Sequence, residues 1–459
     1  MKIIQGGMGV GVSGWQLAKA VCLAGCVGTL SGTAAPELLV NALIKGDIGG
    51  HFRRALKSFP FPNISEEVLA EYFVEEGIQT GKKHAVPMFG LNSSRGLIAL
   101  TICANFALVY LAKEGHNQTV FINYLEKIQI PHIYSIVGAM LAGVDGIVMG
   151  AGIPHQVPKI IDAILAGAKL EYILDVTGGS AENPVKIEFD PVAFLGGSLS
   201  CTRPKFYPIV SSYVLAARLA KNCDGFIVES PTAGGHNAPP RKGKDAVYSP
   251  EGIPLYGPKD NVDWEKMRGL GKPFWIAGSM ASPEALQFAL AQGAEGIQAG
   301  TIFAFCVESG IAKIFKREVC RRVFFGEPLV VRTDFDASPT GFPFKVVCLS
   351  GTLSEESVYE SRCRVCDKGY LRELYVRDDG KIGFRCPAEP VSEYLRKGGK
   401  LEDTEKKVCL CNGLLATVGL GSDKLAILTS GDDLSSLSKL LKHEGDLYTA
   451  EDAIKYLLS

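Results

Sequence analysis

Short apolar runs alternate with helix-like patterns along most of the chain. The clearest are Phe226–Val228, Phe274–Ala277 and Ile297–Ala299, and each ends in a turn that contains glycine. Apolar runs of this length, bounded by glycine and separated by helical patterns, are typical of buried parallel strands. The same pattern predicts five earlier strands, at Lys2–Gln5, Val27–Ser31, Ala85–Asn92, Gly143–Pro154 and Tyr207–Ser212. Eight strands with intervening helices predict an α/β fold, a (β/α)8 TIM barrel with insertions.

Two parts of the chain fall outside this repeat. Residues 168–206, approximately, contain two strand patterns of their own, Tyr172–Gly178 and Val185–Asp190, and are predicted to form an insertion. Beyond Arg332 the chain becomes polar and charged, and five cysteines fall between residues 363 and 411. We therefore predict a barrel over residues 1–335 and a small cysteine-containing, helical C-terminal module over residues 336–459.

Composition limits the classes of partner and compartment. The 459 residues suit a barrel of about 250 residues with insertions and an appendage. A net charge of −1 argues against nucleic-acid or electrostatic membrane partners. The apolar segment Leu97–Leu111 is shorter than a bilayer span and predicts a buried helix. The first residues do not form a signal-peptide pattern, and scattered cysteines indicate reduced thiols, so we expect a cytoplasmic protein.

Glycines near the beginning of the chain allow two interpretations. The run Gly9-Val-Gly-Val-Ser-Gly14 follows the first predicted strand and matches a dinucleotide-binding pattern. The next strand, Val27–Ser31, ends without the Asp or Glu that would hold a ribose hydroxyl in such a fold. We therefore favour a first barrel strand whose glycines bring the backbone against a flat ring.

The glycines after the last three predicted strands indicate a phosphate site. Glycine at the carboxyl end of a parallel strand lets backbone N–H groups approach a phosphate closely. On a β/α barrel the phosphate site usually lies in the loops after strands seven and eight. His236 follows two glycines after the sixth strand, so we expect it to reach toward the reactive end of a phosphate-bearing cofactor. The alternative is a structural loop histidine.

Six segments, in order, resemble the nitronate monooxygenase family, formerly called 2-nitropropane dioxygenase. That flavin family includes the FMN-barrel type of enoyl-acyl-carrier-protein reductase. The matching segments cover roughly residues 1–335 and are Ile3-Ile-Gln-Gly-Gly-Met8, Met149-Gly-Ala-Gly-Ile-Pro154, Tyr207-Pro-Ile-Val-Ser-Ser212, Ala233-Gly-Gly-His236, Ile276-Ala-Gly-Ser279 and Gly296-Ile-Gln-Ala-Gly-Thr-Ile-Phe303. The residues around His236 depart from simpler members, with Ser230-Pro-Thr before it and Asn237-Ala-Pro-Pro after it, so the substrate is not carried over.

The resemblance implies non-covalently bound FMN and assigns roles to particular residues. His236 would be the catalytic base or the residue that orients the substrate. The residues implied to contact the isoalloxazine are Gly6, Gly7 and Met8, those implied to hold the phosphate are Gly234, Gly235, Gly278, Ser279, Gly300 and Thr301, and further contacts are Asn92 and Ser211.

The C-terminal cysteines are candidate metal ligands. They are Cys363, Cys366, Cys386, Cys409 and Cys411. Two pairs at chelating spacing plus a fifth thiolate are enough for a tetrahedral zinc or an iron–sulfur cluster. Polar neighbours make a small hydrophobic core doubtful, and a metal could supply the missing folding energy. Uncoordinated thiols and a transient disulfide are the alternatives.

These observations leave three functions open. The leading one is an FMN-dependent nitronate monooxygenase, which carries out oxidative denitrification of alkyl nitronates or nitroalkanes with O2. The second is an NAD(P)H-dependent FMN enoyl reductase of the FabK type, and the third is a non-catalytic barrel that binds a phosphorylated ligand. The expected partner is a small-molecule substrate, and the sequence leaves open a homo-oligomer or an electron-donor protein.

Overall fold

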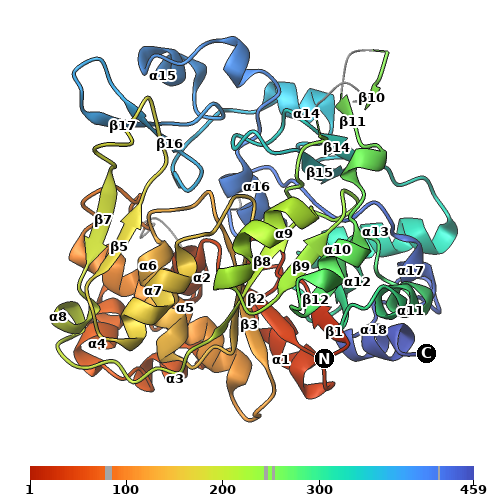
Figure 1. The fold of residues 1–459 in the computed structure, drawn as a ribbon, viewed down its shortest axis with the longest axis horizontal. Coiled ribbons are helices and arrows are strands. Elements are labelled where there is room, and N and C mark those ends of the chain that lie inside the picture. Colours follow the sequence, from red (N-terminus) through yellow and green to blue (C-terminus); the bar gives the residue numbers. More distant parts are fainter. Residues whose placement is uncertain (78–84, 242–246, 251–253, 422–423) are drawn as a thin grey trace.

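Eight parallel strands form a closed barrel at the centre of the protein (Figure 1). The computed structural model describes residues 1–77, 85–241, 247–250, 254–421 and 424–459. Backbone hydrogen bonds from Gln5 to Val27 (2.9 Å) and from Val27 to Ile3 (3.2 Å) join the first strand to the second and close the barrel. In their order around the barrel the strands are β1 (Ile3–Gln5), β13 (Gly296–Ala299), β12 (Phe274–Ala277), β9 (Phe226–Glu229), β8 (Lys205–Val210), β4 (Gly146–Gly150), β3 (Val120–Leu125) and β2 (Gly28–Ser31). The predicted fold class is confirmed.

The barrel interior is a packed core at its amino-terminal end. Alternate residues of the strands point inward, and those of the inner cluster are at most 3% exposed. Phe121, Tyr207 and Trp275 meet there, with ring centroids 5.2 Å apart for the first pair and 5.5 Å for the second. The indole N–H of Trp275 donates to the carbonyl of Met1 at 2.8 Å. Because this end is filled, cavities in the barrel can lie only toward the carboxyl ends of the strands.

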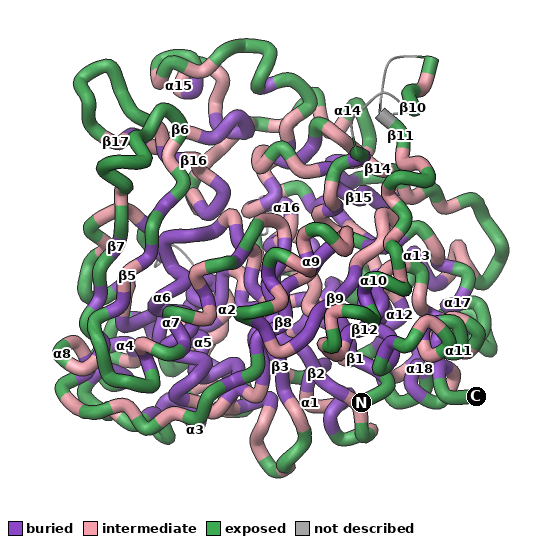
Figure 2. The backbone as a smooth tube through the Cα atoms, in the orientation of Figure 1, coloured by how far each residue is buried: buried purple, intermediate pink, exposed green. Residues whose placement is uncertain are grey.

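Helices surround the barrel and bury the outer faces of its strands (Figure 2). The largest, α5 (Arg95–Lys113), is longer than predicted. Among the described helices it alone is long and apolar enough to cross a membrane, but 78% of its most apolar 18-residue stretch is buried inside the fold. It packs against five other helices as a core element. The other helices up to residue 325 are α1 (Trp15–Leu23), α2 (Ala35–Ile44), α3 (His51–Lys57), α4 (Pro62–Tyr72), α6 (His132–Leu141), α7 (Val157–Leu165), α8 (Pro191–Leu195), α9 (Tyr213–Leu219), η1 (Ala220–Asn222), η2 (Pro258–Asp260), α10 (Trp264–Gly269), α11 (Pro283–Ala291), α12 (Thr301–Ala304) and α13 (Lys313–Phe325).

The predicted third strand, Ala85–Asn92, is wrong. This segment has no strand, and the barrel strand is β3, which follows α5. Pro87 cannot donate a ladder hydrogen bond, and Gly90 weakens strand packing, so the apolar character of the segment serves burial of Val86 and Phe89 instead.

The insertion and the C-terminal part of the chain contact each other above the barrel (Figure 1). Both predicted strand segments of the insertion contain strands, but the first is split into β5 (Leu170–Ile173) and β6 (Val176–Thr177). The second is β7 (Lys186–Phe189), which pairs with β5, and β6 pairs with β16 (Glu373–Val376). The other elements are β10 (Val247–Tyr248), β11 (Pro254–Leu255), β14 (Val331–Asp334), β15 (Phe344–Val347), α14 (Glu356–Ser361), β17 (Ile382–Arg385), α15 (Val391–Arg396), η3 (Glu402–Thr404), α16 (Leu410–Thr417), α17 (Ser435–Ser438) and α18 (Ala450–Leu457). The predicted domain boundary near residue 335 stays a prediction.

Of the predicted loop over residues 239–258, only part can be placed. Residues 247–248 and 254–255 form the short antiparallel pair β10–β11, and the Tyr256 hydroxyl donates to the carbonyl of Ala238 at 2.8 Å. Residues 242–246 and 251–253 lie outside the described residues.

Candidate active site

Two adjoining cavities lie at the carboxyl ends of the barrel strands. The first has a volume of about 120 Å³ and the second about 130 Å³. The walls of both include Gly7, Gly9, Glu229, Gly235 and Thr429, so the two form one continuous site. All the predicted cofactor residues except Asn92 and Ser211 line the first cavity: Gly6, Gly7, Met8, Gly234, Gly235, Gly278, Ser279, Gly300 and Thr301.

The glycine turns leave room that side chains would fill. Gly278 has φ +93°, and a Cβ there would lie 2.1 Å from the Ser230 hydroxyl oxygen. At Gly7 a Cβ would lie 2.4 Å from that of Asn123. Only glycine fits these positions without moving a neighbour, so backbone forms the cavity wall at both turns. The turns after β12 and β13 lead into α11 and α12, whose first N–H groups have no partner within the helix.

The C-terminal segment supplies part of the first cavity, which sequence reasoning missed. Thr429, Ser430, Gly431 and Asp433 line it opposite the barrel turns. The N–H of Gly235 donates to the Thr429 hydroxyl at 2.8 Å, and the N–H of Gly431 donates to the Thr301 hydroxyl at 2.8 Å. The only signal in the sequence is a run of small polar residues with glycine directly after the apolar Leu425–Leu428.

His236 lines the second cavity together with Asn123 and Tyr124. Its Nε2 lies 2.8 Å from the Ser338 hydroxyl, and that hydroxyl lies 2.8 Å from the hydroxyl of Thr340. Its backbone bridges antiparallel to Phe344, and the two rings meet edge to face at 4.9 Å. Burial lowers the pKa of His236 to about 4. The imidazole is therefore neutral at neutral pH and can accept a proton or hydrogen-bond a substrate without a charge of its own.

Glu229 and Asn123 are the side chains of this site that sequence reasoning missed. Glu229 ends β9 and lines both cavities, and burial raises its pKa to about 8. Asn123 lies in β3, and its Nδ2 donates to the carbonyl of Gly7 at 3.1 Å. Glu229 directly follows an apolar run whose register could have revealed it, whereas Asn123 was hidden because β3 was not assigned.

Two predicted cofactor residues lie elsewhere. Asn92 is in the turn that precedes α5, not at a strand end, and it does not line either cavity. Ser211 follows β8 as predicted, but its carbonyl accepts from the Arg241 guanidinium at 3.3 Å and it too is absent from both walls.

The residues present fit a flavin mononucleotide. The glycine turns and the start of α12 offer backbone N–H groups to a phosphate, and the residues that line the first cavity include no lysine or arginine. The side-chain oxygens of Asn123 and Gln298 are buried at these cavities with no partner among the described residues. Buried polar atoms are normally paired, so both oxygens are available to a bound ring with N–H groups.

The predicted metal site is not supported. In the described part of the chain, which contains all five cysteines, there is no group of three or more His, Cys, Asp or Glu side chains that could hold a metal. Cys363 is exposed, Cys386 is buried, and the thiol of Cys409 accepts from the Asn412 amide at 3.5 Å. The segment does not depend on a metal for a core, because Leu374, Tyr394 and other apolar residues are buried there.

Solved structures that match this chain include FabK, a nitroalkane oxidase and an enoyl reductase domain. FabK from Thermotoga maritima has a TM-score of 0.50 at 14% identity, covering 99% of this chain and 91% of that one. A nitroalkane oxidase from Streptomyces ansochromogenes has a TM-score of 0.47 at 15% identity, covering 100% and 94%. The enoyl reductase domain of MlnA from Bacillus amyloliquefaciens has a TM-score of 0.36 at 12% identity, covering 76% and 64%.

Sequence comparison adds nothing to these likenesses. The chain does not match any family model. It does not match any curated protein either. The resemblance predicted from the six segments is therefore confirmed at the level of fold: this chain has the (β/α)8 barrel fold of FabK.

Proposed function

We propose that this protein is an FMN-dependent oxidoreductase, and that its reaction is the oxidation of alkyl nitronates with O2. The observation that carries the proposal is the convergence of glycine turns from four strands with His236 around one continuous pair of cavities. The fold shared with FabK supports a flavin barrel but does not select a substrate.

The first cavity would hold the cofactor. The turns at Gly234, Gly278 and Gly300 would hold the phosphate through backbone N–H groups, and Gly6, Gly7 and Met8 would lie along the ring system. FMN, when bound, supplies an acceptor for one or two electrons and a centre that O2 reoxidises.

Neutral His236 is suited to hold the substrate in the second cavity. Its Nε2 is placed by Ser338 at 2.8 Å, so the ring has a fixed orientation. A neutral imidazole can hydrogen-bond an anionic nitronate or take a proton from the carbon next to a nitro group. A pKa of about 4 makes it a weak base, which favours the orienting role over proton abstraction.

One observation favours the enoyl reductase as a second candidate. Glu229, with a pKa of about 8, is largely protonated at neutral pH and faces both cavities. Reduction of a carbon–carbon double bond requires a proton donor beside the substrate as well as a hydride donor. A protonated carboxyl in this position meets that requirement.

A pair of assays distinguishes the candidates on purified protein reconstituted with FMN. Nitronate-dependent O2 uptake without nicotinamide supports the monooxygenase. Anaerobic bleaching of the flavin by NAD(P)H supports the reductase. A protein that stays colourless after reconstitution contradicts both and leaves the non-catalytic barrel. His236→Gln serves as the matched control, since it should abolish substrate turnover while the flavin spectrum stays.

We further propose a cytoplasmic location. All 13 cysteines are free thiols, as is usual in a reducing compartment. A homo-oligomer or an electron-donor protein as partner stays a prediction.

A further inference from the structure

A cavity larger than either of those in the candidate active site lies elsewhere in the described part of the chain. Its volume is about 390 Å³, within the range of small-molecule pockets. It is enclosed by the loop after β3, by β6 of the insertion and by the β16–β17 hairpin. Much of the wall is apolar, including Phe89, Ile128, Ile130, Leu371 and Phe384. We call it the outer cavity.

Tyr370 lines both this cavity and a narrow neighbouring one, and its hydroxyl is unsatisfied. The residue is 7% exposed and lines the outer cavity, and its hydroxyl is buried with no hydrogen-bond partner among the described residues. Burial raises its pKa well above the ordinary value, so the hydroxyl remains a proton donor. A buried hydroxyl without a partner destabilises a fold unless a water or ligand accepts from it.

Arg372 adds a positive charge without a carboxylate partner. Its guanidinium donates to the carbonyls of Gly369 (3.1 Å) and Phe89 (2.6 Å) and lies 4.7 Å from the centre of the Phe384 ring. Among the described residues it makes no ion pair.

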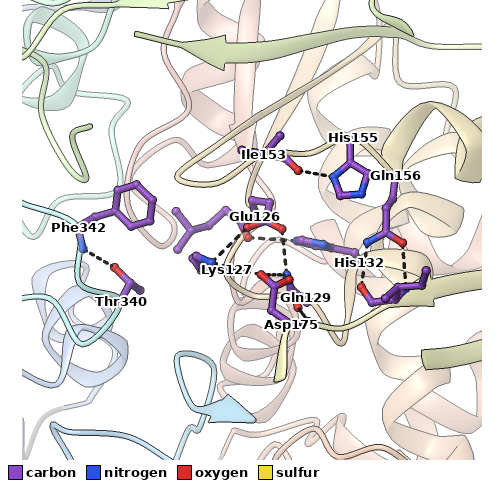
Figure 3. A network of polar contacts seen from close by, with 12 residues as sticks. Glu126, Lys127, Gln129, His132, Ile153, His155, Gln156, Asp175, Thr340 and Phe342 are labelled. Atoms are coloured by element: carbon purple, nitrogen blue, oxygen red, sulfur yellow. Dashed lines mark hydrogen bonds and ion pairs between the residues drawn. The ribbon is translucent and has the colours of Figure 1, made fainter. Parts of the chain in front are cut away.

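The other charged residues of the wall are paired. The Lys127 Nζ lies 3.4 Å from the Asp175 carboxylate, and the Glu373 carboxylate lies 2.6 Å from the Arg385 guanidinium. Figure 3 labels Lys127 and Asp175 beside Gln129. The wall thus carries about one uncompensated positive charge, that of Arg372, and this charge favours an anion.

A narrow cavity separates the outer cavity from the candidate active site. It has a volume of about 20 Å³ and shares Tyr370 with the outer cavity and Tyr124 with the second flavin cavity. This space holds about one water molecule. His132 lines it and is held in place, because its Nε2 lies 3.1 Å from the Leu125 carbonyl. The outer cavity is therefore joined to the flavin site only through this narrow space.

We propose that the outer cavity binds a small monocarboxylate with an apolar tail. The carboxylate pairs with the Arg372 guanidinium and accepts from the Tyr370 hydroxyl, while the tail packs against the apolar wall. A group with one negative charge matches the single uncompensated cation, and the tail matches the apolar lining.

The test uses the full chain loaded with FMN and titration calorimetry with linear carboxylates from butanoate to decanoate. We expect saturable one-to-one binding that strengthens with chain length, and weaker binding of the matching alcohols and of inorganic phosphate. Tyr370→Phe and Arg372→Met should each weaken binding roughly ten- to hundred-fold, because a hydrogen bond to a charged group is lost. Tyr375→Phe and Arg377→Met, on the same hairpin but outside the cavity wall, should bind as the parent does.

The stability of Tyr370→Phe separates binding from structure. Because the hydroxyl has no partner, the ligand-free variant should melt at the parent temperature or above it, whereas a structural role would lower that temperature. The flavin spectrum should be unchanged in both variants, so the outcome does not depend on the proposed reaction. Absence of saturable binding at millimolar carboxylate, equal binding of alcohols, or full binding by Tyr370→Phe would overturn the proposal.

Discussion

The wall between the barrel turns and the C-terminal segment can be tested with one methyl group. In Gly234→Ala the new Cβ would lie 2.8 Å from the carbonyl carbon of Ser430 and 2.9 Å from the nitrogen of Gly431. Ordinary contacts begin at 3.4 Å, so backbone must move by about 0.6 Å at the closer contact. Both neighbours are main-chain atoms and cannot turn away as a side chain would.

The expected effects follow from the displaced contacts. Overpacking of this kind costs about 1–3 kcal/mol. The hydrogen bonds from Gly235 to Thr429 and from Gly431 to Thr301 lie in the same wall, so we expect them to weaken. If the movement of this wall also removes one or two backbone hydrogen bonds to the phosphate, FMN affinity should fall roughly tenfold.

The assay is thermal unfolding together with fluorescence titration of FMN. Gly269→Ala is the matched control, because its Cβ would meet no heavy atom within 4 Å in α10. That control should be neutral or slightly stabilised. If Gly234→Ala kept the parent melting temperature and FMN affinity, the C-terminal segment could not form the wall described here. Lower stability with unchanged FMN affinity would separate the fold from the cofactor site.

Four further predictions concern the same site. The pKa of Glu229 in the folded protein, about 8, exceeds its ordinary value of 4.5, so between these pH values the folded state keeps a proton that the unfolded state loses, and stability falls as pH rises. Flavin-free Glu229→Gln should lose this pH dependence and gain on the order of 2 kcal/mol of unfolding free energy at about pH 8, measured by urea unfolding. The same pH dependence of stability in both proteins would contradict this prediction. Ser338→Ala should lower kcat several-fold with the flavin spectrum intact, because the His236 ring loses its partner, and an unchanged kcat would exclude that orienting contact. Residues 1–335 alone should aggregate without binding FMN, because α18 packs on α1 and the first cavity loses its wall; a soluble yellow barrel in size-exclusion chromatography would contradict this. Treatment with EDTA should leave the melting temperature unchanged, and stoichiometric zinc or iron by metal analysis would reverse this conclusion.

The barrel is predictable because its strands are buried on both faces. Continuous apolar runs such as Phe226–Val228 carry that information locally, and the glycines after them mark the carboxyl rim. The parallel arrangement then brings those turns to one end of the barrel, so most of the proposed cofactor residues can be grouped from the sequence alone.

The missing strand shows where local pattern fails. β3 follows the long apolar helix α5, and two adjoining apolar segments give no periodicity that separates them. Ala85–Asn92 resembles a strand more closely because glycine and asparagine end it. The error moved an expected amide contact from Asn123, which contacts Gly7, to Asn92, which does not line the site.

The contribution of the C-terminal segment could not be predicted from the sequence. Gly235 and Thr429, which are hydrogen-bonded, are 194 residues apart, and pairing at that distance is set by tertiary packing. The cysteines misled for the same reason. Their spacing suits chelation, but Cys386 is buried, Cys363 is exposed, and the described residues include no group of three or more candidate ligands that could hold an ion.

One short stretch of chain, residues 338–340, borders two chambers. The Ser338 hydroxyl is hydrogen-bonded to His236, and Thr340 lines the outer cavity. The hydroxyls of Ser338 and Thr340 are joined by a 2.8 Å hydrogen bond. A ligand that displaced Thr340 would disturb the hydrogen bond between Ser338 and His236 without contacting the flavin cavities. Ligand binding in the outer cavity would then change the rate of the reaction at His236.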